Sequence, residues 1–248
     1  MMLETSRAFA HLYLMSSSTV RVASYNIRKA IGTDRRRNPE RILAVLAEID
    51  ADIVALQEAD RRFGQRSAAI PRMLLDHKSD YQPAPLNVQT DSIGWHGNAI
   101  LVRKSARITL SDIIHLPYLE PRGAVVAEVD FGAISLRLFG MHLDLSGLWR
   151  RKQAHAIIHA YENASVMPTL LAGDLNEWSA ERGCLADFSR HFGFAACGRS
   201  FHSRRPVASL DRIMHCNQLK ITACGVHDSP NARRASDHLP IWADVKLA

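Results

Sequence analysis

The sequence predicts a mixed α/β fold, and three observations lead to that prediction. The chain has 248 residues, of which 47% are hydrophobic, so it can bury a large core. Short apolar runs bounded by Gly, Pro, Asn or Asp recur along it, as is typical of strands. Segments with apolar residues at helical spacing lie between them. Since no repeat or long linker divides the chain, we expect one domain over residues 19–248.

The expected strands are short runs of alternating or continuous apolar residues, each ended by a turn-forming residue. In chain order they are Val20–Tyr25, Ile53–Leu56, Asn98–Val102, Ala124–Val129, Ile134–Met141, Thr169–Ala172, Leu210–Met214, Leu219–Gly225 and Ile241–Val245. Their alternation with helical segments favours a mixed α/β fold.

Three helices are expected between the strands. The first is Pro39–Ile49, with Asn38 as N-cap and proline at the first helical position. Its apolar residues share one face of the helix. The second is Leu148–Tyr161, and Glu181–His191 forms the third with a less regular pattern.

The charge balance favours an anionic partner. Lys and Arg number 31 against 25 Asp and Glu, which gives a net charge of +6. Basic residues cluster at Arg35–Arg37, Arg61–Arg62, Arg150–Lys152 and Arg233–Arg234. Any one of these clusters can equally be a solvated surface, so the charge alone does not identify a substrate.

Cysteine usage and hydropathy favour a cytoplasmic protein. The four cysteines show no C-x-x-C spacing, so they indicate neither a zinc ribbon nor a disulfide framework. No apolar run approaches the roughly 20 residues that span a bilayer. The first residues lack the basic start of a signal peptide, and we expect residues 1–18 to form a flexible extension.

Polar side chains recur at the ends of the predicted strands, where α/β folds commonly place functional groups. They are Asn26, Glu58, Asn98, His142, Asp144, Asp174, Asn176, Asp211, Asp237 and His238. A single Asp or Asn after a strand is usually a turn former or helix cap. The whole set, however, supplies hard oxygen ligands, amide donors and a neutral-pH base, which are the groups needed to attack a phosphate ester with water.

The motifs S-Y-N-I, L-Q-E, G-N-A-I-L, H-L-D, G-D-L-N, L-D-R-I and S-D-H-L-P occur in this order between Val20 and Val245. Together they resemble the endonuclease/exonuclease/phosphatase (DNase I-like) superfamily. The resemblance implies a four-layer α/β sandwich, in which two mixed sheets pack face to face with helices outside. It also implies an active site at one end of the sheets.

The resemblance implies a divalent metal, Mg²⁺ with Mn²⁺ as a substitute, held mainly by Glu58 with Asn26 beside it and Asp237 contributing. Magnesium binds through one or two protein carboxylates and keeps waters that phosphate oxygens can replace. Glu58 also follows the apolar run I-V-A-L, where a carboxylate requires a partner.

The resemblance also implies the catalytic roles. Asp174 resembles the residue that orients or deprotonates the attacking water, and Asn176 the amide that stabilises charge in the transition state. His238 resembles the terminal histidine that binds phosphate or transfers a proton, with Asp211 orienting its ring. The expected catalytic set is His238, Asp174, Asn176, His142 and Asp211.

His142 stands where many relatives have a phosphate-contacting histidine, whereas base-excision members often have tyrosine there. This difference favours nonspecific nucleases, lipid phosphodiesterases and phosphatases over abasic-site endonucleases. Arg122 is an expected phosphate clamp, with a surface arginine as the alternative reading. Asn98 is an expected substrate-binding residue, with a backbone turn as its alternative.

Other catalytic classes lack their motifs. His155 and His159 are four residues apart, but alanine replaces the glutamate that a zinc-protease helix requires. The chain has no G-x-S-x-G nucleophile elbow and no phosphate-binding G-x-x-x-x-G-K loop. Serine hydrolases and P-loop nucleotide hydrolases are therefore excluded.

Basic residues beside the motifs predict a polyanionic substrate, with Arg28 and Arg150 as substrate-binding residues. We expect nucleic acid first, and a phospholipid or small phosphoester as the alternative, in a chain assumed to be monomeric. A catalytically silent anion-binding module is a third hypothesis. The presence of Glu58, Asp174 and His238 argues against it.

Overall fold

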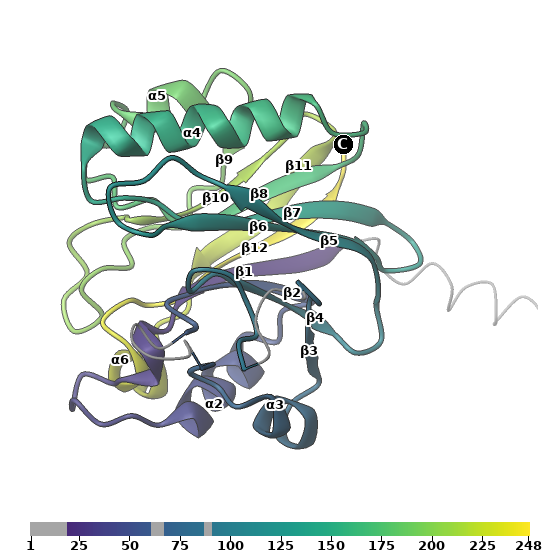
Figure 1. The fold of residues 1–248 in the computed structure, drawn as a ribbon. Coiled ribbons are helices and arrows are strands. Elements are labelled where there is room, and N and C mark those ends of the chain that lie inside the picture. The colour runs from purple at the N-terminus through teal and green to yellow at the C-terminus, as the bar shows by residue number, and fades with distance from the viewer. Residues whose placement is uncertain (1–18, 61–66, 87–90) are drawn as a thin grey trace, which may run out of the picture.

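The computed structural model describes residues 19–60, 67–86 and 91–248. The expected extension at residues 1–18 and the basic pair Arg61–Arg62 lie outside the described residues. Two six-stranded mixed sheets pack face to face, and helices cover their outer faces (Figure 1). This architecture confirms the predicted four-layer sandwich.

The first sheet has the order β11-β12-β1-β2-β4-β3. Its strands are β11 (Leu219–Val226), β12 (Ile241–Leu247), β1 (Val20–Asn26), β2 (Ile53–Gln57), β4 (Ala99–Arg103) and β3 (Tyr81–Pro83). Only β1 and β2 run parallel among these described neighbours, and all other pairs are antiparallel.

The second sheet has the order β5-β6-β7-β8-β10-β9. Its strands are β5 (Arg107–His115), β6 (Gly123–Asp130), β7 (Ser135–His142), β8 (Thr169–Asp174), β10 (Asp211–His215) and β9 (Gly193–Phe194). Here β7 and β8 form the parallel pair. Each sheet therefore has one parallel pair at its centre.

The central strands are buried on both faces, which explains why β2 and β8 consist of nearly continuous apolar residues. The sheets come close at Gly140, where an added Cβ would lie 3.4 Å from the Ala55 Cβ. A side chain at Gly140 would therefore push the sheets apart. This close packing fixes the ends of the two parallel pairs relative to each other.

Helices cover each sheet on its outer side (Figure 1). The helices α2 (Pro39–Ile49), α3 (Arg72–Lys78) and α6 (Pro230–Ala235) lie below the first sheet, and α4 (Gly147–Glu162) and α5 (Cys184–Phe188) lie above the second. The Asn38 side chain accepts a hydrogen bond of 3.0 Å from the Arg41 amide, which confirms the predicted N-cap of α2. Within the described ranges, no helix has both the length and the apolar character needed to cross a bilayer.

The nine expected strands and the first two helices are confirmed with shifts of one or two residues at their ends. The third helix was predicted too long, because α5 covers only Cys184–Phe188. Gly183 precedes it at φ 63°, and the segment before that turns back on Glu177, which accepts from the Ser179 amide. A glycine at positive φ ends helical geometry.

Several short or exposed elements were missed: β3, β5, β9, α3 and α6. The longest is β5, an edge strand whose residues are mostly exposed or half-buried. Burial on one face produces the alternating pattern that marks a strand, and β5 lacks it.

Candidate active site

The two parallel strand pairs end at the same place and bring the predicted polar residues together. Asn26 pairs in register with Gln57, so Glu58 follows directly beside it. His142 pairs with Asp174 in the other sheet. Asn26 Nδ2 donates to Asp174 Oδ2 at 2.9 Å and so joins the two sheets. Carboxylates and amides far apart in sequence thereby share one site.

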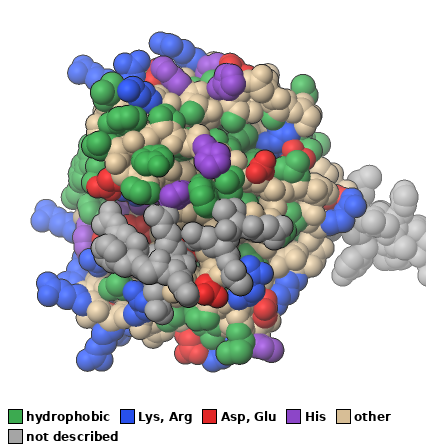
Figure 2. Space-filling model, in the orientation of Figure 1, with side chains coloured by type: hydrophobic (Ala, Val, Ile, Leu, Met, Phe, Trp, Pro, Cys, Tyr) green, Lys and Arg blue, Asp and Glu red, His purple; other side chains and the backbone are tan. Residues whose placement is uncertain are grey.

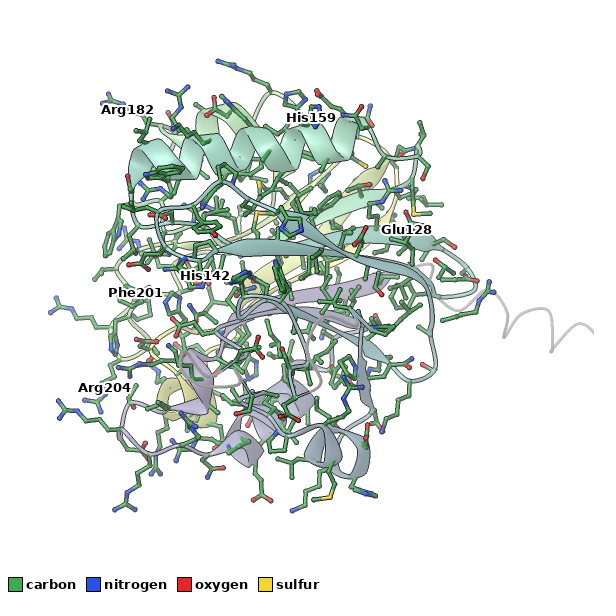
Figure 3. The ribbon with its side chains drawn as sticks, viewed as in Figure 1. Glu128, His142, His159, Arg182, Phe201 and Arg204 are labelled. Atoms are coloured by element: carbon green, nitrogen blue, oxygen red, sulfur yellow. The ribbon has the colours of Figure 1, made fainter. Side chains whose placement is uncertain are left out.

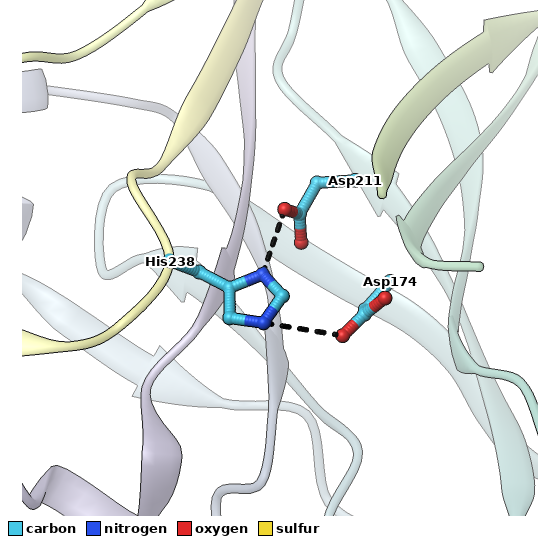
Figure 4. A group of neighbouring side chains, drawn as sticks. All are labelled: Asp174, Asp211 and His238. Carbon is cyan, nitrogen blue, oxygen red and sulfur yellow. Dashed lines mark hydrogen bonds and ion pairs between the residues drawn. The ribbon is translucent and has the colours of Figure 1, made fainter. Parts of the chain in front are cut away.

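His238 lies between two carboxylates (Figure 4). Its Nδ1 donates to Asp211 Oδ2 at 2.9 Å, and its Nε2 lies 3.7 Å from Asp174 Oδ2. Ser200 Oγ also donates to Asp211 Oδ2. The Phe201 ring packs against the imidazole, with ring centroids 4.8 Å apart. All three members of the Asp174–His238–Asp211 group are buried, so the histidine has a fixed orientation.

Opposite charge sets the protonation of this group. Burial alone would lower the pKa of His238, but the carboxylates of Asp211 and Asp174 raise it to about 10. Burial would raise the pKa of Asp174, yet the charge of His238 and the Asn26 hydrogen bond lower it. At neutral pH the site therefore contains an imidazolium beside an ionised aspartate.

His142 is the second histidine on Asp174, but its protonation differs. Its Nε2 lies 3.5 Å from Asp174 Oδ2, and Arg122 Nη1 lies 2.9 Å from its Nδ1. Burial, with a smaller contribution from the Arg122 cation, lowers the pKa of His142 to about 4. His142 is therefore neutral at pH 7. Figure 3 shows it at the left end of the sheets, with Phe201 close by.

The proposed metal carboxylates are both paired with cations. Glu58 forms an ion pair with Lys29, and Asp237 Oδ2 lies 3.2 Å from Arg28 Nε. Burial would raise the pKa of Glu58, but His142, when it is protonated, and the Lys29 ammonium lower it. An ionised carboxylate in this position is suited to bind a cation.

Asn176 and Asn98 have different hydrogen-bonding states. Asn176 Nδ2 donates to the Leu143 carbonyl at 2.9 Å, and its backbone amide donates to Asp174 Oδ1 at 3.0 Å. Asn98 Nδ2 donates to the Gly123 carbonyl at 2.8 Å. The described part of the chain offers no partner to Asn98 Oδ1, which is buried.

Unpaired buried polar atoms concentrate at the site. Among the described residues, the side-chain atoms in this state are Tyr25 Oη, Asn98 Oδ1, Arg122 Nε and Asp211 Oδ1. Three of the four belong to predicted site residues. Since buried polar groups are normally hydrogen-bonded, this concentration indicates a site adapted to a polar ligand or ordered water.

Arg150 was expected to bind substrate at a basic rim of the site, and the structure corrects this expectation. Its side chain is only 11% exposed, and its Nη2 pairs with Glu177 Oε2 at 3.2 Å. It also donates to the Leu145 carbonyl at 2.6 Å. Arg150 therefore holds the loops after β7 and β8 together and is turned away from solvent. Exposed basic side chains instead project at the lower left of Figure 2.

Some site residues were not identified from the sequence. Ser236 Oγ donates to the Asn26 carbonyl at 2.7 Å, and Ser200 and Phe201 support the Asp211–His238 pair. The segment containing Ser200 and Phe201 follows no predicted strand and carries no motif, so no sequence signal was available. Ser236 does lie within the S-D-H-L-P motif.

Two groups of residues offer metal ligands. The first consists of Glu58, Asn26 and Asp237, whose oxygen atoms suit a hard divalent cation. The second consists of Asp174, Asp211 and His238, whose ligand atoms lie within 4.8 Å of one another. His238 donates from Nδ1 to Asp211, and its raised pKa keeps the ring protonated. The second group is already joined by its own hydrogen bond and ion pairs, whereas the first group supplies oxygen ligands alone, which a hard divalent cation prefers.

The pKa of His238 can be tested directly by NMR titration of the imidazole in EDTA. We expect the ring to be protonated at about pH 8, and Asp211→Asn to lower its pKa because a counter-charge is lost. The folded pKa of about 10 exceeds the unfolded value of about 6.5, so the charged His238 stabilises the folded protein. This stabilisation is complete below about pH 6.5 and is lost as the pH rises through about 10. Exposed Asp112→Asn is the control. An unchanged titration in Asp211→Asn would contradict the assigned coupling.

The chain was compared with models of protein families and with curated proteins. A model of the Endonuclease/Exonuclease/phosphatase family matches residues 23–238, which include almost all of the site. The sequence comparison found no match among curated proteins.

Solved structures share the fold at low sequence identity. The D. rerio TDP2 structure complexed with a single-strand DNA product is 19% identical with a TM-score of 0.72, covering 93% of this chain and 100% of that chain. The human Nocturnin catalytic domain with bound sulfate is 19% identical with a TM-score of 0.71, covering 94% and 96%. A Bacteroides thetaiotaomicron mannosyl-6-phosphatase is 18% identical with a TM-score of 0.71, covering 92% and 99%.

Proposed function

Because the chain belongs to the Endonuclease/Exonuclease/phosphatase family, we propose that it is a divalent-metal-dependent phosphodiesterase acting on nucleic acid. Members of this family hydrolyse phosphoesters. The observation that carries the proposal is the charge arrangement around Asp174. An ionised carboxylate lies between a neutral histidine, His142, and a protonated one, His238.

This arrangement assigns a base and an acid within one site. Asp174 has a lowered pKa and orients the attacking water through its carboxylate. His238 holds a proton on Nε2 that it can donate to a phosphate oxygen or to the leaving group, while Asp211 fixes the ring through Nδ1. Asn176, held by the Leu143 carbonyl, presents an amide to the negative charge that develops on phosphorus.

The metal would be held by Glu58 and Asn26 with Asp237. When bound, it supplies Lewis-acid polarisation of a phosphoryl oxygen and neutralises charge. Arg122 and His142 are in contact with each other and form a phosphate-binding pair beside it. The Arg28 guanidinium can donate to phosphate oxygens, and the unpaired Asn98 Oδ1 can accept a hydrogen bond from a donor group of the substrate or from a water.

Exposed arginines favour a nucleic-acid substrate. Arg233 and Arg234 have side chains 45% and 71% exposed on α6, which directly precedes the S-D-H segment of the site. Trp178 is 63% exposed two residues after Asn176 and contacts Phe201 edge-on, so it can stack on a base. The D. rerio TDP2 structure that contains single-strand DNA product has the same fold.

A phospholipid or small phosphoester is the second candidate, and a specific surface favours it. The segments beside Arg122 and His142 expose large apolar side chains, namely Tyr118, Leu119 and Leu145 in loops and Leu148 in the first turn of α4. Apolar side chains at a site entrance suit a substrate with an apolar part. The mannosyl-6-phosphatase neighbour shows that this fold also occurs in a sugar phosphatase.

A substrate panel in Mg²⁺ distinguishes these functions. It compares single-stranded DNA, RNA, plasmid, bis(p-nitrophenyl) phosphate, p-nitrophenyl phosphate and a phosphatidylcholine vesicle. We expect cleavage of the synthetic diester and of at least one nucleic acid. Hydrolysis of the vesicle or monoester with all nucleic acids intact would favour the second candidate. No hydrolysis of any substrate would contradict a phosphodiesterase and support an anion-binding module.

A further inference from the structure

A three-residue turn directs two cations at the proposed metal carboxylates. The turn η1 (Arg28–Ala30) follows β1 two residues after Asn26. Arg28 pairs with Asp237 at 3.2 Å, and Lys29 pairs with Glu58. Thus both carboxylates assigned to the metal already have a cationic partner from one short segment of the same chain.

The backbone fixes the position of this turn. Arg28, Lys29 and Ala30 have φ values of 47°, 56° and 58°, in the left-handed region that non-glycine residues rarely adopt. Lys29 N donates to the Glu58 carbonyl at 3.0 Å, and Ala30 N donates to the Ile27 carbonyl at 2.8 Å. Lys29 and Glu58 are therefore joined through the main chain as well as through their side chains.

The side chain of Lys29 is partly enclosed in the site. Its exposed fraction is 27% and that of the Glu58 side chain is 25%, so solvent screens the pair less than it screens a surface ion pair. Lys78 and Glu40 form such a surface pair, with side chains 59% and 60% exposed. The Lys29–Glu58 pair should therefore have a larger effect on any ligand of Glu58.

A divalent cation and an ammonium group cannot share Glu58 without repulsion. The ammonium occupies lone pairs that a metal would use, and its charge opposes the approach of the metal. The four-carbon stem of lysine is flexible, so the ammonium can leave the carboxylate while the turn keeps its backbone position. Exchange between the two cations at Glu58 is thus sterically simple.

We propose that Lys29 is an internal counter-cation that competes with the divalent metal for Glu58 and so sets the metal concentration at which the protein is loaded. The inference rests on the proposed function, because it takes Glu58 as a metal ligand. In the metal-free protein Lys29 neutralises Glu58 and holds the site together. Metal binding displaces the ammonium, and its affinity is reduced by the strength of the ion pair.

The test measures Mn²⁺ binding to the full chain by electron paramagnetic resonance of the free ion, without substrate. Lys29→Met keeps an unbranched, flexible stem and removes the charge, and we expect it to bind Mn²⁺ about tenfold more tightly than the wild type. Lys29→Gln should act in the same direction. Lys78→Met is the matched control, because it removes a lysine from an exposed ion pair, and it should bind as the wild type does.

Glu58→Gln separates failure of this inference from failure of the proposed function. If Glu58→Gln leaves Mn²⁺ affinity unchanged, Glu58 is not a ligand and the proposed metal site is wrong. If Glu58→Gln weakens binding while Lys29→Met and Lys29→Gln bind no more tightly than the wild type, the metal site stands and competition by Lys29 is overturned. Circular dichroism of each variant checks folding, and Lys29→Gln decides the matter if Lys29→Met does not fold.

Discussion

Asp174→Asn is expected to lower the rate of diester hydrolysis by about two to four orders of magnitude, as removal of a positioned proton-transfer group does. The substitution keeps the shape of the side chain but removes the charge that orients the attacking water. It also removes one of the carboxylates that raise the pKa of His238. The imidazole therefore loses proton affinity, and the base and the acid of the proposed mechanism are impaired together.

The measurement is single-turnover hydrolysis of bis(p-nitrophenyl) phosphate in Mg²⁺, with thermal unfolding of the same samples. The fold should be retained, because an asparagine can still accept the 2.9 Å hydrogen bond that Asn26 donates. Asp112→Asn changes an exposed aspartate on the edge strand β5 and serves as the control. Turnover within a few-fold of the wild type in Asp174→Asn would show that another residue activates the water.

Removal of divalent metal is expected to abolish hydrolysis, and restoration of Mg²⁺ or Mn²⁺ is expected to recover it. The proposed substrate contacts include Arg122 and Arg28, but Arg28 is partly neutralised by Asp237. Glu58 and Asp174 both carry negative charge near the phosphate site. Without a metal these carboxylates would repel a phosphodiester, so the loss should exceed that of any single substitution.

The experiment dialyses the protein against EDTA, assays the same diester and then titrates in each metal. Ca²⁺ and Zn²⁺ serve as comparison ions, because they differ from Mg²⁺ in preferred coordination. Circular dichroism before and after dialysis verifies that the fold persists. Undiminished hydrolysis in EDTA would contradict the metal-dependent mechanism.

The helices and strands that could be predicted from the sequence are those whose pattern of apolar and polar residues reflects their burial. The strand Ile53–Gln57 is apolar up to its last residue because both of its faces are covered, and α2 begins where Asn38 and proline specify a helix start. The strand Arg107–His115 could not be identified in the same way. It is held by pairing with β6, and its mostly exposed side chains carry no alternation.

In the candidate site, too, some features could be predicted from the sequence and others could not. Asn26, Glu58, Asp174 and His238 were selected because each lies at a strand end within a motif. The distances between these residues depend on the order of the strands in the two sheets, and a local sequence pattern does not specify that order. The structure brings Asn26 of one sheet to within hydrogen-bond distance of Asp174 of the other, although 148 positions separate them in the chain.

The protonation states and the directions of the arginines were decided by tertiary structure. His142 and His238 are both histidines at strand ends, yet the pKa of one is about 4 and that of the other about 10, because burial and the Arg122 cation prevail at His142, whereas the carboxylates of Asp211 and Asp174 prevail at His238. Arg150 was expected on the rim and instead pairs with Glu177 inside the molecule. Lys29, three residues after Asn26 in the chain, is the cation that contacts Glu58.

By itself, the sequence identified the family through its motifs, and with the family came the expected sandwich and a candidate set of site residues, because motifs and burial patterns are local properties of the chain. Only the tertiary structure decided which of those residues are charged, which are neutral and which cations pair with the carboxylates proposed to bind metal. The physical reason is that pKa values and ion pairs depend on distances between segments and on burial, and both arise when the two sheets pack together.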